Sequence, residues 1–416
     1  MIDNQNTKTQ PITKEQVWEA YLQVRKKGNS SGVDQLTLRD YEAVKGKELY
    51  KVWNRMASGS YFPPPVRRVV IPKGEGGSRK LGIPTVNDRV AQMVVRRYLE
   101  PKLERIFHKN SYGNRTGRGA HMALQQTREQ CWKRNWVIDI DIQCFFDNLD
   151  HELLMKAHHH HVYEKWIVLY IERWLKAPID HGDGKMTYPE KGSPQGGVIS
   201  PLLSNLFLHY AFDRWMELNH PTVFFERYAD DMIVHCSTRE QAEGLLKIIE
   251  ERMKACKLSL HPTKTRIVYC KQEGRKEDYP VVSFDFLGFT FKPKKAQGHD
   301  GRCFLGFGPV MSRKSATKMI AEIRGLGLHR RTNSEITTLA ELVKSKLTGW
   351  FQYYGRLDKW SLSYVMFKLN ERLIKWASKR FKRFKRSKLK ARKWLINLSR
   401  DFPNLFYHWQ LGFKPC

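Results

Sequence analysis

Two adjacent aspartates, Asp230 and Asp231, lie at the centre of a largely apolar stretch of the sequence. Residues 224–236 read Phe-Phe-Glu-Arg-Tyr-Ala-Asp-Asp-Met-Ile-Val-His-Cys, a pattern that predicts a strand, a tight turn at the aspartates and a second strand. Two carboxylates at the tip of an apolar hairpin repel each other, so the arrangement is costly unless a cation binds there. Taken alone, the pair is also compatible with a solvated turn.

A second acidic strand is predicted by residues 136–142, which read Trp-Val-Ile-Asp-Ile-Asp-Ile. Side chains alternate along a strand, so Asp139 and Asp141 point to the same face. If one of them joins Asp230 and Asp231, the carboxylates provide the hard oxygen ligands that Mg²⁺ prefers. Two such ions, about 3.5–4 Å apart, can activate a 3′-hydroxyl and stabilise a pyrophosphate leaving group.

The charge balance points to a polyanionic partner. The 416 residues include 73 Lys and Arg against 42 Asp and Glu, a formal net charge of +31, which favours nucleic acid or an anionic membrane surface. The start of the chain is polar, and no apolar run approaches the ~20 residues of a membrane span. The seven cysteines are scattered and form no Cys-x-x-Cys pair, so we expect a reduced cytoplasmic protein without a signal peptide or transmembrane segment that binds RNA or DNA.

Hydrophobic periodicity divides the chain into a mixed part and a helical part. Strands mixed with helices predict an α+β or α/β sheet domain over roughly 60–295, whereas residues 312–384 have an almost wholly helical pattern. We expect one boundary near residue 305 and a weaker one near 375, where a densely basic segment begins. The strand-like runs are 67–72, 136–142, 224–236 and 281–291. The helical patterns are 13–27, 87–107, 150–176, 200–218 and 239–256.

The order of the motifs resembles that of the group II intron-encoded reverse transcriptase/maturase family. Tyr228-Ala-Asp-Asp231 matches the reverse transcriptase signature. One departure lies at Gln35, which follows Gly-Val-Asp at a position that is usually Gly. Together the matches span about residues 30–355. The other matching segments are 32–34, 79–85, 88–89, 111–113, 141–147, 192–202, 258–267, 286–289 and 349–354.

The resemblance implies an α+β right-hand polymerase of fingers, palm and an all-α thumb. The N-terminal extension and fingers, with palm contributions, would occupy residues 1–135, and the palm would occupy 136–304. A helical thumb, called the maturase X domain, would follow over 305–374. Residues 375–416 would form a basic nucleic-acid-binding segment. Because cysteine pairs are absent near the C-terminus, we expect a member of the family without an endonuclease domain.

The resemblance also implies roles for individual residues. Asp141, Asp230 and Asp231 would be the catalytic triad and would bind two Mg²⁺ ions, with Mn²⁺ as a possible substitute. Asp139 would then be a neighbour that tunes the site. The residues that would bind the incoming dNTP are Lys73, Arg79, Phe146 and Gln195.

Three of the four predicted dNTP contacts have a plainer alternative. Phe146 would act as an aromatic gate that clashes with a ribose 2′-hydroxyl, but it could instead be a core aromatic beside Phe145. Lys73 and Arg79 would bind the triphosphate, but they could also lie on a solvated basic turn.

Eight further residues are predicted to bind nucleic acid. For some of them a role without nucleic acid is also open. Trp350 could belong to the core, Lys264 could be an ordinary surface residue, and the basic segment from residue 375 could be a solvated helix face. The residues are Arg118, Lys264, Trp350, Tyr353, Lys382, Arg383, Lys385 and Arg386.

The function implied is an RNA-directed DNA polymerase that adds dNTPs to a primer 3′-hydroxyl. It would also bind its parent group II intron RNA to promote splicing and retrohoming into a target DNA. The protein would be located in the bacterial cytoplasm and would associate with the nucleoid when it binds DNA. Two alternatives stay open: a domesticated reverse transcriptase in phage defence or DNA repair, and a maturase that binds RNA for splicing only. The sequence makes no prediction of oligomeric state.

Overall fold

The computed structural model describes residues 10–73, 77–297, 301–385 and 387–416, and it contains two units. The first unit comprises the chain up to Ala123 together with Ile138–Ile267, and the second comprises Leu124–Val137 and Val268–Cys416. Helices and mixed sheets confirm the predicted α+β class. The assignment of fingers, palm and thumb to particular segments stays a prediction. Among the described residues, no helix combines the length and the apolar character that a bilayer crossing needs.

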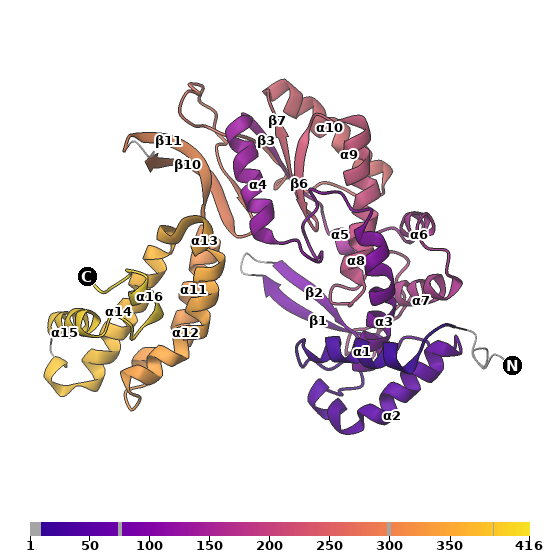
Figure 1. Ribbon diagram of the computed structural model, residues 1–416, viewed down its shortest axis with the longest axis horizontal. Helices are drawn as coiled ribbons and strands as arrows, with labels where there is room; N and C mark the ends of the chain where they lie inside the picture. The colour runs from indigo at the N-terminus through magenta and orange to yellow at the C-terminus, as the bar shows by residue number, and fades with distance from the viewer. Residues whose placement is uncertain (1–9, 74–76, 298–300, 386) are drawn as a thin grey trace. The chain divides into compact units, whose positions relative to one another are not determined.

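Three helices from the N-terminal part pack together in the first unit (Figure 1). They are α1 (Lys14–Arg25), α2 (Leu38–Ala57) and α3 (Val86–Glu104). The structure confirms the predicted helices at α1 and α3. Hydrophobic periodicity did not predict α2, although Thr37 caps it in a reciprocal box with Asp40.

Between α1 and α2 the chain turns at Gln35, whose φ is 56°. This left-handed conformation is unfavourable for a residue with a Cβ atom. It provides a physical reason for the glycine that is usual at this position.

A four-stranded sheet follows, with the order β2-β1-β4-β5. Strands β1 (Val66–Lys73) and β2 (Gly77–Ile83) form an antiparallel hairpin, and β1 pairs in parallel with β4 (Ile179–Asp180). The short strand β5 (Met186–Thr187) completes the sheet. The strand predicted at 67–72 is confirmed as β1.

The second sheet contains the two acidic segments and has the order β6-β7-β3-β8. Its strands are β3 (Trp136–Asp141), β6 (Phe224–Tyr228), β7 (Asp231–Cys236) and β8 (Arg266–Tyr269). Strands β6 and β7 pair antiparallel, and Tyr228 lies opposite Asp231. The predicted strand, turn and strand over 224–236 are thus confirmed.

Helix α10 (Arg239–Ala255) packs beside β7 of this sheet (Figure 1). The predicted helix over 200–218 is interrupted, because a π-helical turn η1 (His209–Asp213) separates α8 (Ser200–Leu208) from α9 (Arg214–Asn219). The pattern over 150–176 likewise divides into α6 (His151–His159) and α7 (Lys165–Leu175). Helix α5 (Phe145–Asn148) also belongs to this part.

The second unit begins with most of α4 (Ala120–Lys133) and a three-stranded sheet of order β11-β10-β9. The single strand predicted over 281–291 was wrong, because left-handed Leu287 and Gly288 turn the chain between β9 (Phe284–Phe286) and β10 (Phe289–Gln297). Strand β11 (Cys303–Met311) was not predicted, since its glycines and proline are unfavourable in strands.

The rest of the second unit is helical, which confirms the pattern predicted from residue 312 onward. Its buried core includes Leu369, Leu373 and Trp376. The basic segment also contributes to this core, because Phe384 is buried, meets the Phe381 ring edge-on and packs at a tilt against Trp394. The helices are α11 (Arg313–Gly325), α12 (Ile336–Tyr353), α13 (Gly355–Asp358), α14 (Ser363–Arg380), α15 (Lys388–Asp401) and α16 (Tyr407–Gln410), with short 3₁₀ turns η2 (Leu328–Arg330), η3 (Lys359–Leu362) and η4 (Lys382–Phe384).

Candidate functional site

Three aspartates meet at one end of the β6-β7-β3-β8 sheet. Asp141 is the last residue of β3, Asp231 is the first residue of β7, and Asp230 lies in the turn before it. The turn has only two residues between paired Tyr228 and Asp231, so both carboxylates are held at the strand ends. The sequence therefore folds in a way that brings the predicted triad together from segments about ninety residues apart.

The like charges of these aspartates perturb their titration. The pKa of Asp231 is raised to about 7. The largest cause is the loss of hydration on burial, and the negative charges of Asp230, Asp141 and Asp139 add to it. Asp231 is itself an exposed residue, and the charges of three other aspartates act on it. Burial and the charge of Asp141 raise the pKa of Asp230 as well. A cluster with this many carboxylates is stabilised by a cation.

Two basic residues balance part of the negative charge of the aspartates. Lys264 lies just before β8, and Arg266 is the first residue of β8. Lys264 Nζ lies 2.9 Å from Asp141 Oδ2, and Arg266 Nε lies 3.2 Å from Asp139 Oδ2. Lys264 is thus placed at the carboxylates, whereas it was predicted as a weak contact to nucleic acid. Its role there stays a prediction.

The aspartates supply the hard carboxylate oxygens that Mg²⁺ prefers. Within the described residues, no three His, Cys, Asp or Glu side chains are already arranged to hold a metal ion together. Mg²⁺ is commonly bound by one or two carboxylates together with substrate phosphates and water. Carboxylates from two adjacent strands, open to solvent at Asp231, match that mode of binding.

Arg79 and Gln195 extend the site toward β2. The Arg79 Nε donates to Gln195 Oε1 at 2.9 Å, and the positive charge of Arg79 lowers the pKa of Asp230 while burial raises it. Two residues predicted to bind dNTP are therefore brought together within electrostatic reach of the carboxylates. Lys73, the other cation predicted to bind dNTP, ends β1, but its side chain lies outside the described part of the structure.

The loop that carries Gln195 is fixed to β2 at Gly82. The Gly82 N–H donates to the Gln195 carbonyl at 2.8 Å. At Gly196, where φ is 126°, an added Cβ would lie 2.5 Å from the Gly82 carbonyl oxygen. A side chain at Gly196 would therefore push the loop away from the strand.

A buried network, which the sequence analysis missed, supports the same loop from α3. Gln92 Oε1 accepts from the backbone N–H groups of Val198 and Ile199, at 2.7 and 3.2 Å. Gln92 Nε2 in turn donates to Asp88 at 2.9 Å. Asp88 also accepts from Trp174 and Tyr61, and burial raises its pKa to about 6.

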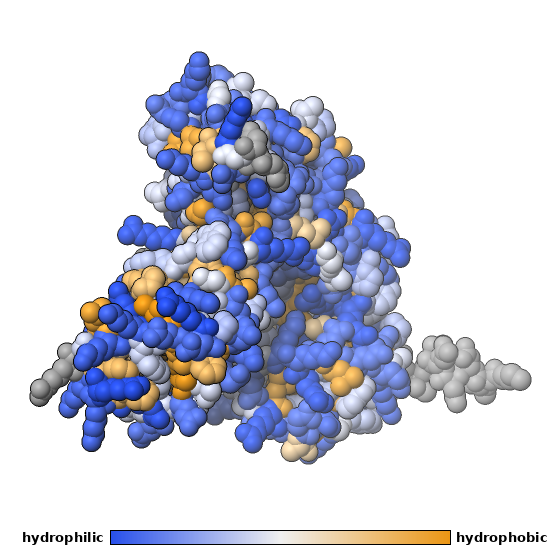
Figure 2. Space-filling model, turned by 60° about the vertical axis from the view of Figure 1, so that its left-hand side comes forward, coloured by the Kyte–Doolittle hydropathy of each residue, from blue (hydrophilic) through white to orange (hydrophobic). Residues whose placement is uncertain are grey.

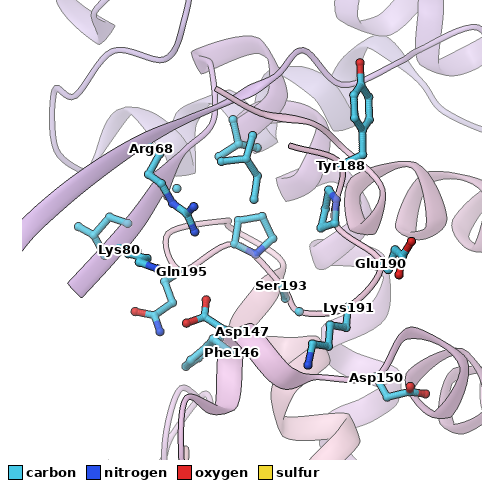
Figure 3. A pocket seen from close by; sticks show the side chains of 17 residues that line it. Arg68, Lys80, Phe146, Asp147, Asp150, Tyr188, Glu190, Lys191, Ser193 and Gln195 are labelled. Atoms are coloured by element: carbon cyan, nitrogen blue, oxygen red, sulfur yellow. The ribbon is translucent and has the colours of Figure 1, made fainter. Parts of the chain in front are cut away.

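Phe146 faces a pocket of about 690 Å³ together with Gln195 (Figure 3). Its ring meets Phe145 edge-on at 5.3 Å between centroids, but Phe145 is the buried member of the pair. The structure thus places Phe146 at the pocket rather than wholly in the core. Arg68, Lys80 and Lys191 also line this pocket (Figure 3).

The remaining predicted nucleic-acid contacts have varied surroundings. The Arg118 guanidinium lies over the Tyr112 ring at 5.8 Å. Trp350 packs against the helical core, and the Tyr353 hydroxyl donates to the Leu287 carbonyl at 2.8 Å. Among the basic residues of η4 and the segment after it, Lys382, Arg383 and Lys385 are exposed, and Arg386 lies outside the described residues.

A basic pocket in the second unit, which the sequence analysis did not predict, collects five cations from α11, α14 and α15. Its volume is about 150 Å³ and its one carboxylate, Glu371, pairs with Lys368 at 3.0 Å. The other four cations form no ion pair with any carboxylate that the structure describes. Around these helices the surface is mainly hydrophilic, with small separate apolar patches (Figure 2). The unpaired cations of the basic pocket are Arg324, Arg372, Lys375 and Lys388.

Two segments of the chain match known protein families. Residues 71–291, more than half of the chain, match the family described as reverse transcriptase (RNA-dependent DNA polymerase). Residues 316–394 match the maturase-specific domain of group II introns. The carboxylates and the Arg79–Gln195 pair lie within the first segment, and the basic pocket lies within the second.

Curated relatives share parts of this sequence. Protein YkfC of Escherichia coli (strain K12) is 33% identical over 310 residues, which cover 65% of this chain and 78% of that protein. The group II intron-encoded protein LtrA of Lactococcus lactis subsp. cremoris is 35% identical over 165 residues, 39% of this chain and 27% of that protein. The putative COX1/OXI3 intron 1 protein of Saccharomyces cerevisiae is 29% identical over 181 residues, 44% of this chain and 22% of that protein.

Proposed function

The chain belongs to the reverse transcriptase (RNA-dependent DNA polymerase) family and contains a group II intron maturase-specific domain, and from this premise we propose that it copies RNA into DNA and also binds its parent intron RNA. The substrates would be dNTPs and a DNA primer annealed to an RNA template. Binding of the intron RNA would promote splicing and insertion into a target DNA.

The observation that carries the polymerase proposal is the meeting of Asp141, Asp230 and Asp231 beside the Arg79–Gln195 pair. Carboxylates with a guanidinium within electrostatic reach of them suit a reaction between a primer hydroxyl and a triphosphate. The carboxylates would hold the cations, and the guanidinium would bind phosphate oxygens directly.

The side chains would divide the work as follows. Mg²⁺ bound to the three carboxylates would lower the pKa of the primer 3′-hydroxyl and stabilise charge on the departing pyrophosphate. Arg79 would donate to the triphosphate, and its bond to Gln195 would keep the guanidinium plane oriented. Phe146 would exclude a ribose 2′-hydroxyl from the pocket wall and so favour deoxynucleotides.

The basic pocket supports the proposed binding of RNA by the second unit. Four unpaired cations that converge on about 150 Å³ repel one another, and a phosphate group relieves that repulsion. Arg324 and Arg372 supply planar forks for phosphate oxygens, whereas Lys375 and Lys388 act as point charges. We assign this pocket to the phosphate backbone of the intron RNA.

Primer extension tests the polymerase proposal. The purified protein is given an annealed RNA template, a DNA primer, dNTPs and Mg²⁺, beside the Asp230→Asn variant. We expect the variant to lose activity by about 10³-fold, because several kcal/mol of metal stabilisation disappear. Asp183→Asn, which changes an exposed turn aspartate, is the matched control and should extend normally.

Splicing of the intron RNA by the same proteins tests the second role. Asp230→Asn should still support splicing, since the proposed contacts to intron RNA are made by the basic pocket and not by Asp230. If the wild type extends no primer on several RNA templates, the polymerase proposal fails. If it extends primers but binds intron RNA no better than unrelated RNA, the maturase proposal fails.

A further inference from the structure

A fully buried ion pair lies directly behind the turn that carries Asp230 and Asp231. Arg227 Nε donates to Asp213 Oδ1 at 2.7 Å, and Arg227 Nη2 lies 2.5 Å from Asp213 Oδ2. Both side chains are 0% exposed. Burying two charges is costly, and a buried ion pair is therefore weak evidence of stabilisation. The geometry of its other hydrogen bonds suggests a different role.

The third nitrogen of Arg227 reaches the turn itself. Nη1 donates to the carbonyl oxygen of Ala229 at 3.1 Å and to Asn205 Oδ1 at 2.9 Å. Asn205 Nδ2 donates to the Gly113 carbonyl at 2.8 Å. One guanidinium thus connects the ion pair, the turn and the neighbouring segment at Gly113.

The turn needs this support, because its backbone is strained. Ala229 has a φ of 56°, in the left-handed region that residues with a Cβ seldom adopt. Gly113 packs so closely that an added Cβ would lie 2.4 Å from the Ala229 nitrogen. Such conformations persist only where the surrounding structure enforces them.

The π-helical turn η1 explains how Asp213 reaches Arg227. Asp213 is the last residue of η1, between α8 and α9. A π-turn inserts an extra residue into a helix and shifts the direction of the side chains that follow, and such turns are frequent at functional sites. The interruption of the helix therefore has a structural consequence at the neighbouring strands.

We propose that Arg227 is a positioning residue that fixes the Ala229 turn, so that the Asp230 and Asp231 carboxylates share one site. Arg227 acts through the Ala229 carbonyl and contacts no reacting group. The metal-binding consequence rests on the proposed function, whereas the ordering of the turn does not.

Hydrogen exchange measured by mass spectrometry tests the ordering of the turn. In Arg227→Lys the charge stays, but one ammonium cannot reproduce the bonds to Asp213, Asn205 and Ala229 together. We expect the amides of residues 228–231 to exchange at least about tenfold faster than in the wild type. Unchanged exchange in the folded variant would overturn the proposal.

His235→Gln is the matched control on the same hairpin. His235 Nε2 lies 2.6 Å from Glu226 Oε2, and both side chains are 0% exposed. Because His235 lies opposite Phe224 at the far end of the hairpin, its loss should leave exchange at 228–231 unchanged. Equal effects from both variants would mean a general loss of stability and would overturn the positioning role.

Gly113→Ala is a second variant, which leaves the ion pair intact. If Arg227→Lys does not fold, Gly113→Ala tests whether the surrounding structure orders the turn at residues 228–231. The added Cβ would displace the Ala229 nitrogen directly, so exchange at 228–231 should again rise. If Gly113→Ala folds with normal exchange at the turn, the proposal is overturned.

Binding of Mn²⁺, measured by electron paramagnetic resonance, separates this proposal from the proposed function. We expect both turn variants to bind Mn²⁺ about tenfold more weakly, since small misplacements of ligands are costly. A wild type that binds no Mn²⁺ would count against the proposed metal site, while the exchange data would still decide the role of Arg227. Altered exchange with normal Mn²⁺ affinity would overturn the positioning of the carboxylates.

Discussion

Arg79 and Gln195 are 116 positions apart in the sequence, yet the Arg79 Nε donates to Gln195 Oε1 at 2.9 Å. This hydrogen bond joins β2 to the loop before α8. Burial raises the pKa of the nearby Asp230 carboxyl, and the positive charge of Arg79 partly opposes that rise. A guanidinium held in this way is oriented before any substrate arrives, which reduces the cost of binding a triphosphate.

Arg79→Lys should therefore raise the KM for dNTP by about tenfold with a smaller change in kcat, because an ammonium keeps the charge but loses the fork. Steady-state incorporation of one nucleotide at varied dNTP measures both constants. Arg39→Lys, at an exposed position on α2, is the control. A KM for dNTP that stays at the wild-type value would remove Arg79 from the triphosphate site.

Phe146→Val should allow ribonucleotides to be incorporated, because the smaller side chain leaves room at the pocket wall for a 2′-hydroxyl. The measurement is the ratio of kcat/KM for a dNTP and the matching rNTP, which we expect to fall by about 10²-fold. Phe145→Leu changes the buried neighbour instead; it should lower the free energy of unfolding by roughly 1 kcal/mol and leave the ratio unchanged. Unaltered discrimination in Phe146→Val would return Phe146 to a purely structural role.

Asp88 makes the stability of the protein depend on pH. Its pKa is about 6 in the folded state, against a usual value of 3.8, so the folded state binds the proton more tightly than the unfolded state. The resulting stabilisation is complete below about pH 4 and is lost as pH rises through 6, a change of about 3 kcal/mol. Asp88→Asn does not titrate, so its free energy of unfolding should decline less between pH 4 and pH 7. Parallel pH profiles for the two proteins, measured by denaturant unfolding, would contradict this assignment.

The basic pocket makes a prediction about salt. Loss of a cation that contacts phosphate reduces the slope of log affinity against log salt by about 0.7 for single strands and about 0.9 for duplexes. Arg372→Gln combined with Lys375→Gln should therefore flatten the slope for intron RNA by roughly twice that amount. Arg239→Gln, which removes an exposed cation paired with Glu243, should leave the slope nearly unchanged. Equal slopes for all three proteins would exclude the pocket from RNA binding.

Local patterns in the sequence predicted the strands that carry Asp141, Asp230 and Asp231. Apolar residues on both sides of Asp230 and Asp231 indicated the hairpin, and the alternation over 136–142 indicated that Asp139 and Asp141 share one face of a strand. These features depend on neighbours in the sequence, where local periodicity is informative. The strands β6 and β7 and the helical character after residue 312 were predictable for the same reason.

The supporting contacts could not be predicted, because they join distant segments. Nothing near Arg227 in the sequence points to Asp213, since a π-helical turn decides where that carboxylate lies. The network from Asp88 through Gln92 to the loop after Gln195 likewise depends on packing between α3 and α7. Helix α2 was not predicted, because many charged residues separate its buried positions.

The most direct test of the central claim is single-nucleotide incorporation on an RNA template by four variants, each with one aspartate replaced by asparagine: Asp139, Asp141, Asp230 and Asp231. The account predicts that the last three lose about 10³-fold in rate. Asp139→Asn should keep most of its activity, because Asp139 pairs with Arg266 and only adjusts the charge near Asp231. Full activity in any of the last three variants, or a loss in Asp139→Asn as large as theirs, would contradict a catalytic site built on Asp141, Asp230 and Asp231.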